Sequence, residues 1–286
     1  MDKPLAVYTD HTCNLYRALA IFDADYSVID SFLLEDFSQY LEGNRIFTRN
    51  EHDAVRKAYE RRSHPRPNQP RDIQEKIQDV ENSRLDIIRT FGQCLIGKGA
   101  DVLRKAASDF MRLKYTDRFP FNGTDVRAFR NHGYRTVMFS GCPAAVTEPF
   151  VDDLDFGEGN VYSSDFELDQ SGCFTGVANP IVEGERKLDL IRKAAKEQES
   201  KLALSTLVLE SITQAPVSRA VGTVYVVTED YMFDQLMGHG WIFCEHGDSL
   251  LSKVLETLPR VKLRYDDRSK IEGIVAAALP DLTKNK

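Results

Sequence analysis

The hydrophobic pattern near the N-terminus predicts one buried strand around which the rest of the chain is organised. Between residues 19 and 22 four apolar residues, LAIF, follow one another without interruption. A short unbroken apolar run is typical of a strand that is buried on both faces of a parallel sheet. The run leads directly into Asp23 and Asp25. Because ligands of open α/β sheets bind beyond the carboxyl ends of the strands, these carboxylates are candidates for chemistry.

The spacing of Asp23 and Asp25 leaves two interpretations open. Alternate residues of a strand share a face, so both carboxylates could open toward one pocket. Their mutual repulsion would then have to be offset by a cation or by a shared proton. In the other interpretation Asp23 only ends the strand and Asp25 begins a turn, as aspartate often does.

After residue 30 the periodicity changes to that of helices. Apolar residues recur at helical spacing in several segments, which are separated by glycines and by a loop with three prolines between residues 63 and 72. No segment of this block has the pattern of a strand of the main sheet. We therefore expect residues 31–118 to form a helical insertion. The predicted helices are 32–41, Glu51–Arg62, Ile73–Cys94 and Asp101–Tyr115.

Four arginines gather around the proline-rich loop. They are Arg61, Arg62, Arg66 and Arg71. One or more of them could meet an anionic substrate. A solvated positive face is the favoured interpretation, because runs of like charge are usually exposed to water.

From residue 119 the pattern alternates between helix and strand, which predicts an α/β core with a parallel sheet. The core is expected to comprise residues 1–30 and 119–286. Residues 197–221 are assigned to neither a strand nor a helix. The predicted strands are Tyr134–Phe139, Thr223–Val227, Trp241–Cys244 and Val261–Tyr265, with a hairpin within Val161–Thr175. The predicted helices are Thr124–His132, Ala144–Leu154, Leu188–Lys196 and Lys270–Leu279.

Two further positions in this half suit the binding of an anion. Ser140 and Gly141 follow a predicted strand, and a hydroxyl next to a glycine N–H is suited to a phosphate. An ordinary Ser-Gly turn is equally compatible with this pair. Lys187 stands at the start of a predicted helix, where a positive charge opposes the helix dipole. An anion held at that helix start would explain the lysine.

Acidic residues follow the predicted strand Thr223–Val227. Glu229, Asp230 and Asp234 could complete a site with Asp23 and bind a hard cation such as Mg²⁺, which prefers oxygen ligands. They could also be a helix cap with solvent-facing acids.

Composition narrows the function classes. The chain has 286 residues, a formal net charge of -7 and a pI near 5.5. This balance argues against a general nucleic-acid binder, whose affinity rests on basic patches. Five scattered cysteines form no CxxC pair, and no apolar run reaches eighteen residues. We therefore expect reduced thiols in a cytoplasmic protein with no membrane contact. The oligomeric state is not readable from the sequence.

Taken in order, these segments resemble the four motifs of the haloacid dehalogenase (HAD) superfamily, and within it the phosphoserine-phosphatase-like branch. Asp23, Asp25 and Ser27 match the first motif, DxDx[TS]. Ser140 with Gly141 matches the second motif and Lys187 the third. Asp230 with Asp234 resembles the acidic fourth motif. The text FSGCPAAVTEPFVDDLDF and SGCFTGVANPIVEGERKLDLI also resembles the same span of that branch.

The resemblance implies a Rossmann-like core, with a parallel sheet flanked by helices, and an inserted helical cap of the C1 type. It implies an Mg²⁺-dependent phosphatase that hydrolyses a small phosphorylated metabolite through an aspartyl-phosphate. Asp23 would be the nucleophile and Asp25 the general acid and base. Mg²⁺ would be held by Asp23, Asp25 and Asp230, with Asp234 as a supporting residue. Ser140, Gly141 and Lys187 would hold the phosphoryl oxygens.

Departures from the family pattern leave alternatives open. Glu229 stands where the fourth motif usually has glycine, so either Glu229 or Asp230 could face the metal. A catalytically weak binding or regulatory protein, or a phosphotransferase that uses the same site, would also fit. Tyr26, Glu35 and Arg45 are candidates for contact with the substrate.

Overall fold

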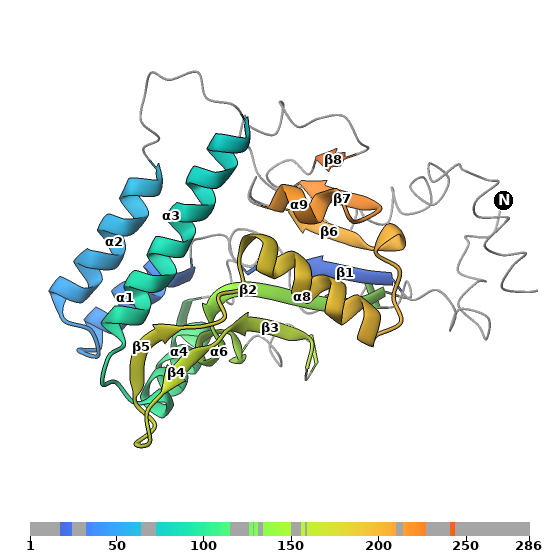
Figure 1. The fold of residues 1–286 in the computed structure, drawn as a ribbon. Coiled ribbons are helices and arrows are strands. Elements are labelled where there is room, and N and C mark those ends of the chain that lie inside the picture. Colours follow the sequence, from blue (N-terminus) through green and yellow to red (C-terminus); the bar gives the residue numbers. More distant parts are fainter. Residues whose placement is uncertain are drawn as a thin grey trace, which may run out of the picture.

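The computed structural model describes the central part of the chain (Figure 1). Two sequence predictions, the strand at 261–265 and the helix at 270–279, lie outside the described residues, and the helix at 124–132 lies partly outside them. The described residues are 18–24, 33–63, 73–114, 126–127, 129–130, 134–149, 156–157, 159–209, 214–226 and 241–243.

A parallel sheet forms the centre of the molecule. Its strand order is β3-β2-β1-β6-β7-β8, and each neighbouring pair is parallel. The first predicted strand, β1, therefore lies in the interior of the sheet, as its unbroken apolar sequence indicated. The strands are β1 (Ala18–Phe22), β2 (Tyr134–Pro143), β3 (Val161–Ser164), β6 (Thr206–Leu209), β7 (Thr223–Val226) and β8 (Trp241–Phe243).

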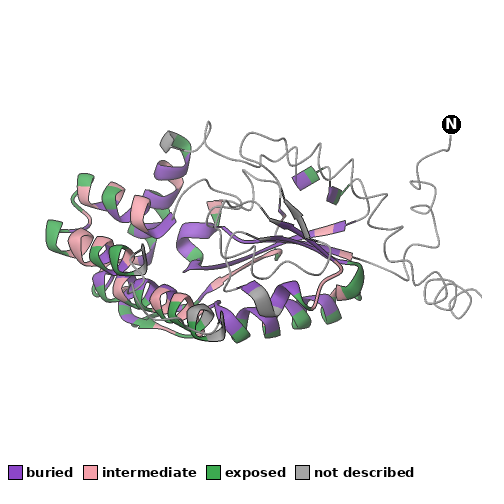
Figure 2. Ribbon diagram, turned by 90° about the horizontal axis from the view of Figure 1, so that it is seen from above, coloured by how far each residue is buried: buried purple, intermediate pink, exposed green. Residues whose placement is uncertain are grey.

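The two faces of β1 are buried against different partners. Leu19 and Ile21 point to one face, where they pack in a cluster with Leu188 and Ile191 of helix α8 (Gly184–Glu197). Seen from above, the buried side of α8 faces the sheet and its exposed side faces outward (Figure 2). This alternation is the period of two that a strand imposes on its side chains.

The opposite face of β1 is aromatic. Phe22 meets the rings of Phe129 and Phe156 edge to face, each with a centroid distance of 5.4 Å. Such T-shaped contacts are favoured by the aromatic quadrupole. The packing fixes the end of β1, and therefore the position of the residue that follows it, Asp23.

Helices α1 to α4 lie between β1 and β2, where the sequence predicts a helical cap. The structure confirms the four helices that were predicted here, at 32–41, 51–62, 73–94 and 101–115, to within a few residues at each end. Phe37 packs against Phe91 and Phe110 of the later helices, with centroid distances of 6.2 Å and 5.1 Å. The helices are α1 (Leu33–Gly43), α2 (Arg49–Ser63), α3 (Ile73–Cys94) and α4 (Ala100–Lys114). The exact boundaries of the cap, 31 and 118, stay a prediction.

The hairpin lies later in the chain than the sequence predicted. Residues 161–164, the first part of the segment predicted to hold the hairpin, instead form β3 and pair in parallel with β2 at the edge of the main sheet. The hairpin consists of β4 (Phe166–Leu168) and β5 (Phe174–Ala178), joined by a turn that Asp169 caps. The prediction was wrong at this point because alternating polarity is common to an edge strand and a hairpin strand.

Two other elements differ from the sequence prediction. Strand β6 lies in the stretch 197–221, which was assigned to neither a strand nor a helix, and it pairs directly with β1. Helix α8 begins at Gly184, four residues before the predicted start, so Lys187 lies in its first turn. Three short helices complete the described elements: α6 (Ala144–Thr147), η3 (Leu202–Leu204) and α9 (Ala215–Ser218). The predicted helix Ala144–Leu154 is therefore seen only in its first turn, since residues 150–155 lie outside the described part.

Gly176 of strand β5 packs closely against Ile96, which follows the end of helix α3. Gly176 has a φ of 89°, and a Cβ there would lie 2.5 Å from Ile96 Cγ1. We expect Gly176→Ala to lower the free energy of unfolding by about 2 kcal/mol, because it adds a steric conflict to left-handed strain. Gly172→Ala is the control, since its φ is 79° but a Cβ there would meet nothing within 4 Å. Equal losses for the two variants in urea denaturation would contradict the packing argument.

None of the described helices is long and apolar enough to cross a lipid bilayer.

Candidate active site

The sheet brings three sequence-predicted residues to one edge. Phe22 at the end of β1 pairs with Met138 of β2, so Asp23 and the Ser140–Gly141 pair follow at the same ends of neighbouring strands. Lys187 arrives from the first turn of α8, which packs on the same sheet. The strand ends of a parallel sheet thus assemble groups that are more than a hundred residues apart in the chain.

The Asp23 carboxylate is surrounded by donors. Lys187 Nζ donates a hydrogen bond to Asp23 Oδ2 at 2.7 Å, and the side-chain amide of Gln214 donates to the same oxygen. The Arg84 guanidinium lies 3.6 Å from Oδ2. The other oxygen, Oδ1, accepts the Ala24 N–H at 2.8 Å. Two cations from different elements therefore face one carboxylate.

A second carboxylate, Glu183, joins the same two cations. Arg84 donates to Glu183 Oε1 at 2.9 Å, and Lys187 Nζ lies 3.7 Å from Glu183 Oε2. Asp23, Arg84, Glu183 and Lys187 are between 2% and 6% exposed, so this group of two acids and two bases is almost fully removed from water. We call these four residues the charge cluster. Buried charges are tolerated when they are paired and hydrogen-bonded in this way.

The charge cluster explains the lysine at the helix start. Burial alone would lower the pKa of Lys187, but the carboxylates of Asp23 and Glu183 more than offset burial and raise the pKa above its ordinary value. Lys187 is therefore a cation in the neutral pH range. The anion expected beside it is supplied within the protein by these two side chains.

Ser140 and Gly141 line the neighbouring strand end. Ser140 is fully buried, and its Oγ accepts the N–H of Cys142 at 3.1 Å. A Cβ on Gly141 would lie 2.6 Å from Ile88 Cδ1 of the cap helix α3 and 3.6 Å from Glu183 Oε2. Gly141 is thus adjacent to the charge cluster, and the absence of a side chain lets α3 approach the strand end.

The remaining predicted catalytic and metal residues lie outside the described part of the chain. These are Asp25, Glu229, Asp230 and Asp234, and the substrate candidate Tyr26 also lies outside that part. Their roles stay predictions. Strand β7, which precedes the three acids, is separated from β1 by β6. The described residue that follows β6 and reaches Asp23 is Gln214.

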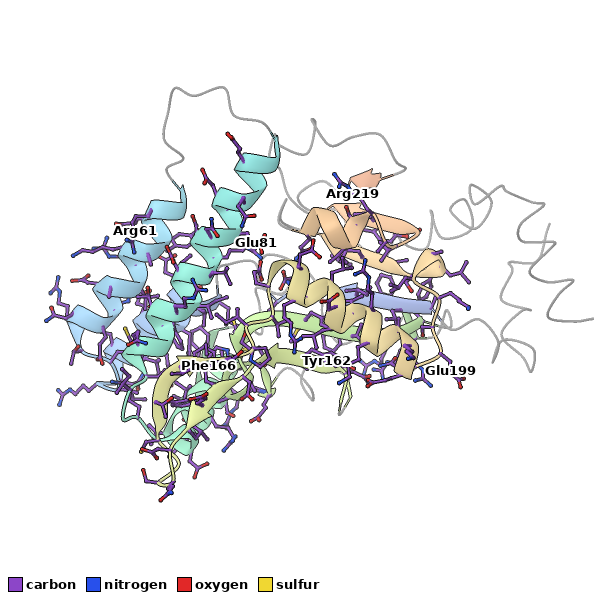
Figure 3. All side chains as sticks on the ribbon, in the orientation of Figure 1. Arg61, Glu81, Tyr162, Phe166, Glu199 and Arg219 are labelled. Carbon is purple, nitrogen blue, oxygen red and sulfur yellow. The ribbon has the colours of Figure 1, made fainter. Side chains whose placement is uncertain are left out.

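The candidate substrate residues of the cap are placed as follows. Glu35 on α1 is half-buried. Its pKa is raised mainly by burial and, to a lesser extent, by the negative charges of Asp36 and Glu60. Arg45 is exposed in the turn after α1 at a φ of 59°. Arg61 is exposed at the end of α2 (Figure 3), while the side chains of Arg62, Arg66 and Arg71 lie outside the described part.

Sequence reasoning missed three residues of the site. Arg84 lies within an amphipathic helix, where an arginine usually indicates a solvated face, and its buried partner Glu183 is 99 positions away. Gln214 has no charge and lies in the stretch that was assigned to neither a strand nor a helix. For Glu183 the sequence did contain a signal. This acidic residue directly precedes the Gly-Glu-Arg-Lys segment that leads into the predicted helix with Lys187.

Glu81 brings a further negative charge to the boundary between cap and core. It lies on α3 close to the start of α8 (Figure 3), and a Cβ on Gly184 would be 1.8 Å from Glu81 Oε1. Burial raises the pKa of Glu81, and the nearby carboxylates of Glu183 and Glu185 raise it further. The folded state therefore favours the protonated form more than the unfolded state does.

This shift predicts a pH-dependent effect of Glu81→Gln. A raised carboxylate pKa costs stability once the pH exceeds the unfolded value near 4.5, and the cost is complete above the folded pKa. We expect Glu81→Gln to raise the melting midpoint at neutral pH by about 1 to 2 °C, and to leave it unchanged at about pH 4. Thermal melts at both pH values test this. Glu75→Gln, an exposed position on the same helix, should change neither, and an unchanged Glu81→Gln midpoint at neutral pH would refute the prediction.

The geometry suits a buried nucleophile or anion-binding group. An aspartate at a strand end, held by a lysine and an arginine and flanked by a serine and a glycine, can receive a phosphoryl group whose oxygens meet positive donors. Within the described part of the chain, no group of three or more His, Cys, Asp or Glu side chains is arranged to hold a metal ion.

Comparisons with known proteins support the fold. No protein-family model and no curated protein matches the sequence. Among solved structures, a protein with unknown function from Bordetella pertussis Tohama I is similar at a TM-score of 0.60 and 18% identity, covering 79% of this chain and 98% of that one. A phosphoserine phosphatase in apo form gives 0.56 at 14% identity, covering 84% and 98%. A HAD family hydrolase from Salmonella enterica serovar Typhi gives 0.54 at 16% identity, covering 83% and 71%.

These similarities extend over most of each chain. The chain therefore shares its fold with the phosphoserine phosphatase and the HAD family hydrolase. This fold is a Rossmann-like parallel sheet flanked by helices, with further helices inserted after β1, as the motif resemblance implied.

Proposed function

We propose that the protein is a phosphatase that hydrolyses a small phosphomonoester at Asp23. The observation that carries this proposal is the contact of 2.7 Å between Lys187 and Asp23, at the end of an interior strand of a fold shared with a phosphoserine phosphatase. A carboxylate that could attack phosphorus and a cation that could bind the transferred group therefore lie side by side. An intact pair of this kind favours catalysis over a purely structural role.

The residues divide the reaction between them. Asp23 would attack phosphorus and form an aspartyl-phosphate, which splits one difficult displacement into two easier ones. Lys187, Ser140 and the N–H of Gly141 would bind the phosphoryl oxygens, where negative charge gathers in the transition state. Asp25 remains the proposed general acid for the leaving oxygen and the base for water in the second step.

The described residues also fit a hard cation beside Asp23. Gln214 Oε1 is buried and has no hydrogen-bond partner among the described residues, while the amide of the same side chain contacts Asp23. One carboxylate and one amide oxygen, with water in the other positions, suit Mg²⁺. Asp23 and Gln214 would hold it together with Asp25 and one of the acids at 229 and 230. When bound, Mg²⁺ would offset the charge between nucleophile and phosphate.

A phosphate-release screen tests the proposal. The purified full chain is incubated with an aryl phosphate and a panel of phosphorylated metabolites, each with Mg²⁺ and with EDTA. We expect phosphate release from at least one ester, with loss of release in EDTA. Absence of release across the panel would count against a phosphatase and favour a binding or regulatory protein. A phosphorylated alcohol formed in the presence of added alcohols would identify a phosphotransferase.

A further inference from the structure

Glu183 occupies an unusual position for a residue at the start of a helix. It is the N-cap residue of α8, yet its side chain makes no capping hydrogen bond. The side chains that are preferred at this position, those of Ser, Thr, Asp and Asn, accept backbone N–H groups of the first turn. The Glu183 carboxylate instead reaches Arg84 at 2.9 Å and approaches Lys187 to 3.7 Å. The N-cap side chain of α8 therefore contacts the site and does not cap the helix. Such departures from local preference are typical of functional positions.

We propose that Glu183 is a positioning residue that balances the charge of the site, so that phosphate is bound weakly enough to leave after hydrolysis. It would act through Arg84 of the cap and Lys187 of the core. This inference rests on the proposed phosphatase function, because it concerns the product of that reaction.

The charges of the cluster support this role. Asp23 and Glu183 carry two negative charges, and Arg84 and Lys187 carry two positive charges, so the four groups sum to zero. All four are almost fully buried, and charges interact strongly where water is excluded. Without Glu183, Asp23 would be the one carboxylate of the charge cluster left to offset the two cations that face an entering phosphate. The anion would then be held more tightly.

The position of Glu183 also connects the cap to the core. Arg84 belongs to α3 of the cap, whereas Glu183 and Lys187 belong to the first turn of α8 in the core. The same carboxylate therefore fixes the cap arginine next to the core lysine. When a phosphate ion leaves the cluster, Arg84 and Lys187 pair with Glu183 again. These ion pairs keep the cap arginine in place for the next substrate.

A set of charge variants tests the inference with inorganic phosphate as the probe. The dissociation constant is measured by calorimetry on the full chain at a fixed Mg²⁺ concentration, and circular dichroism confirms that each variant is folded. We expect Glu183→Gln to bind phosphate about tenfold more tightly, because one nearby negative charge is lost. Arg84→Met should bind it about tenfold more weakly. The double variant should return close to the wild-type value, since the net charge of the cluster is again zero.

A matched control is present on the surface. Arg104 of α4 and Glu148 also join the cap to the core at 2.7 Å, but both side chains are 48% exposed. Glu148→Gln should leave the phosphate dissociation constant unchanged. If Glu183→Gln is unfolded, the double variant and Arg84→Met still give the comparison.

The outcomes separate this inference from the proposed function. Unchanged or weaker phosphate binding in Glu183→Gln, or a double variant no closer to wild type than Arg84→Met, would overturn the role of Glu183 while leaving the phosphatase proposal intact. The expected order of affinities in a chain that hydrolyses no ester would support charge balancing at a phosphate site and remove the catalytic proposal. Stronger product inhibition in Glu183→Gln would support both.

Discussion

Replacing Asp23 with asparagine is expected to reduce kcat for phosphate release by at least about 1,000-fold. The amide that results has almost the same shape but is not a nucleophile toward phosphorus. Because Lys187 and Arg84 stay in place, we expect KM to change far less than kcat. Steady-state kinetics on the best ester from the screen measure both constants.

The control for this variant is Asp189→Asn. Asp189 lies on α8 like Lys187, but its side chain is 62% exposed and forms a local ion pair with Arg192. Wild-type kinetics are expected there. An Asp23→Asn protein that keeps more than about a tenth of the wild-type kcat would exclude covalent catalysis at this carboxylate.

Replacing Lys187 with methionine is expected to cause the largest loss of stability. Methionine fills a similar volume but leaves Asp23 and Glu183 with Arg84 as the one remaining cation of the charge cluster. Breaking a buried ion pair from one side costs about 3 to 5 kcal/mol. Urea denaturation at neutral pH measures the free energy of unfolding, and phosphate release should fall to background in the same variant.

The pH dependence of this loss follows from the raised pKa of Lys187. A lysine whose pKa is higher in the folded state stabilises the protein fully below its unfolded pKa, near 10.5, and loses this contribution as the pH rises through the folded value. The difference between wild type and Lys187→Met should therefore be constant between about pH 6 and pH 9. Lys193→Met, whose side chain is 67% exposed on the same helix, serves as the control. A Lys187→Met protein as stable as wild type would show that the charge cluster contributes no net stability.

The sequence was informative where one strong local pattern determined the structure. The run from Leu19 to Phe22 predicted an interior strand because burial on both faces leaves no polar positions. Lys187 stood out because a lysine in the first turn of a helix opposes the dipole. The structure contains both features. The apolar run forms β1, and the Lys187 ammonium group lies 2.7 Å from Asp23.

The residues that were missed depend on long-range pairing. Arg84 looks like a surface residue of α3, but it is buried beside Glu183, which is 99 positions away in the chain, and beside Asp23. Strand β6 has just four residues, Thr206–Leu209, which is too short to show a period against its flanking apolar residues. Because β6 was missed, the sequence offered no reason to place Gln214 beside β1. The roles of the acids after β7 stay predictions.

Trapping the phosphorylated enzyme tests the central claim most directly. The wild-type chain is mixed with its substrate for a few milliseconds and quenched in acid, and the peptides are then mapped by mass spectrometry. The account predicts a phosphoryl group on Asp23, formed and lost at rates that match turnover, and no such peptide from Asp23→Asn. Phosphate release in the wild type with a phosphoryl group on another residue, or with identical release from Asp23→Asn, would contradict it.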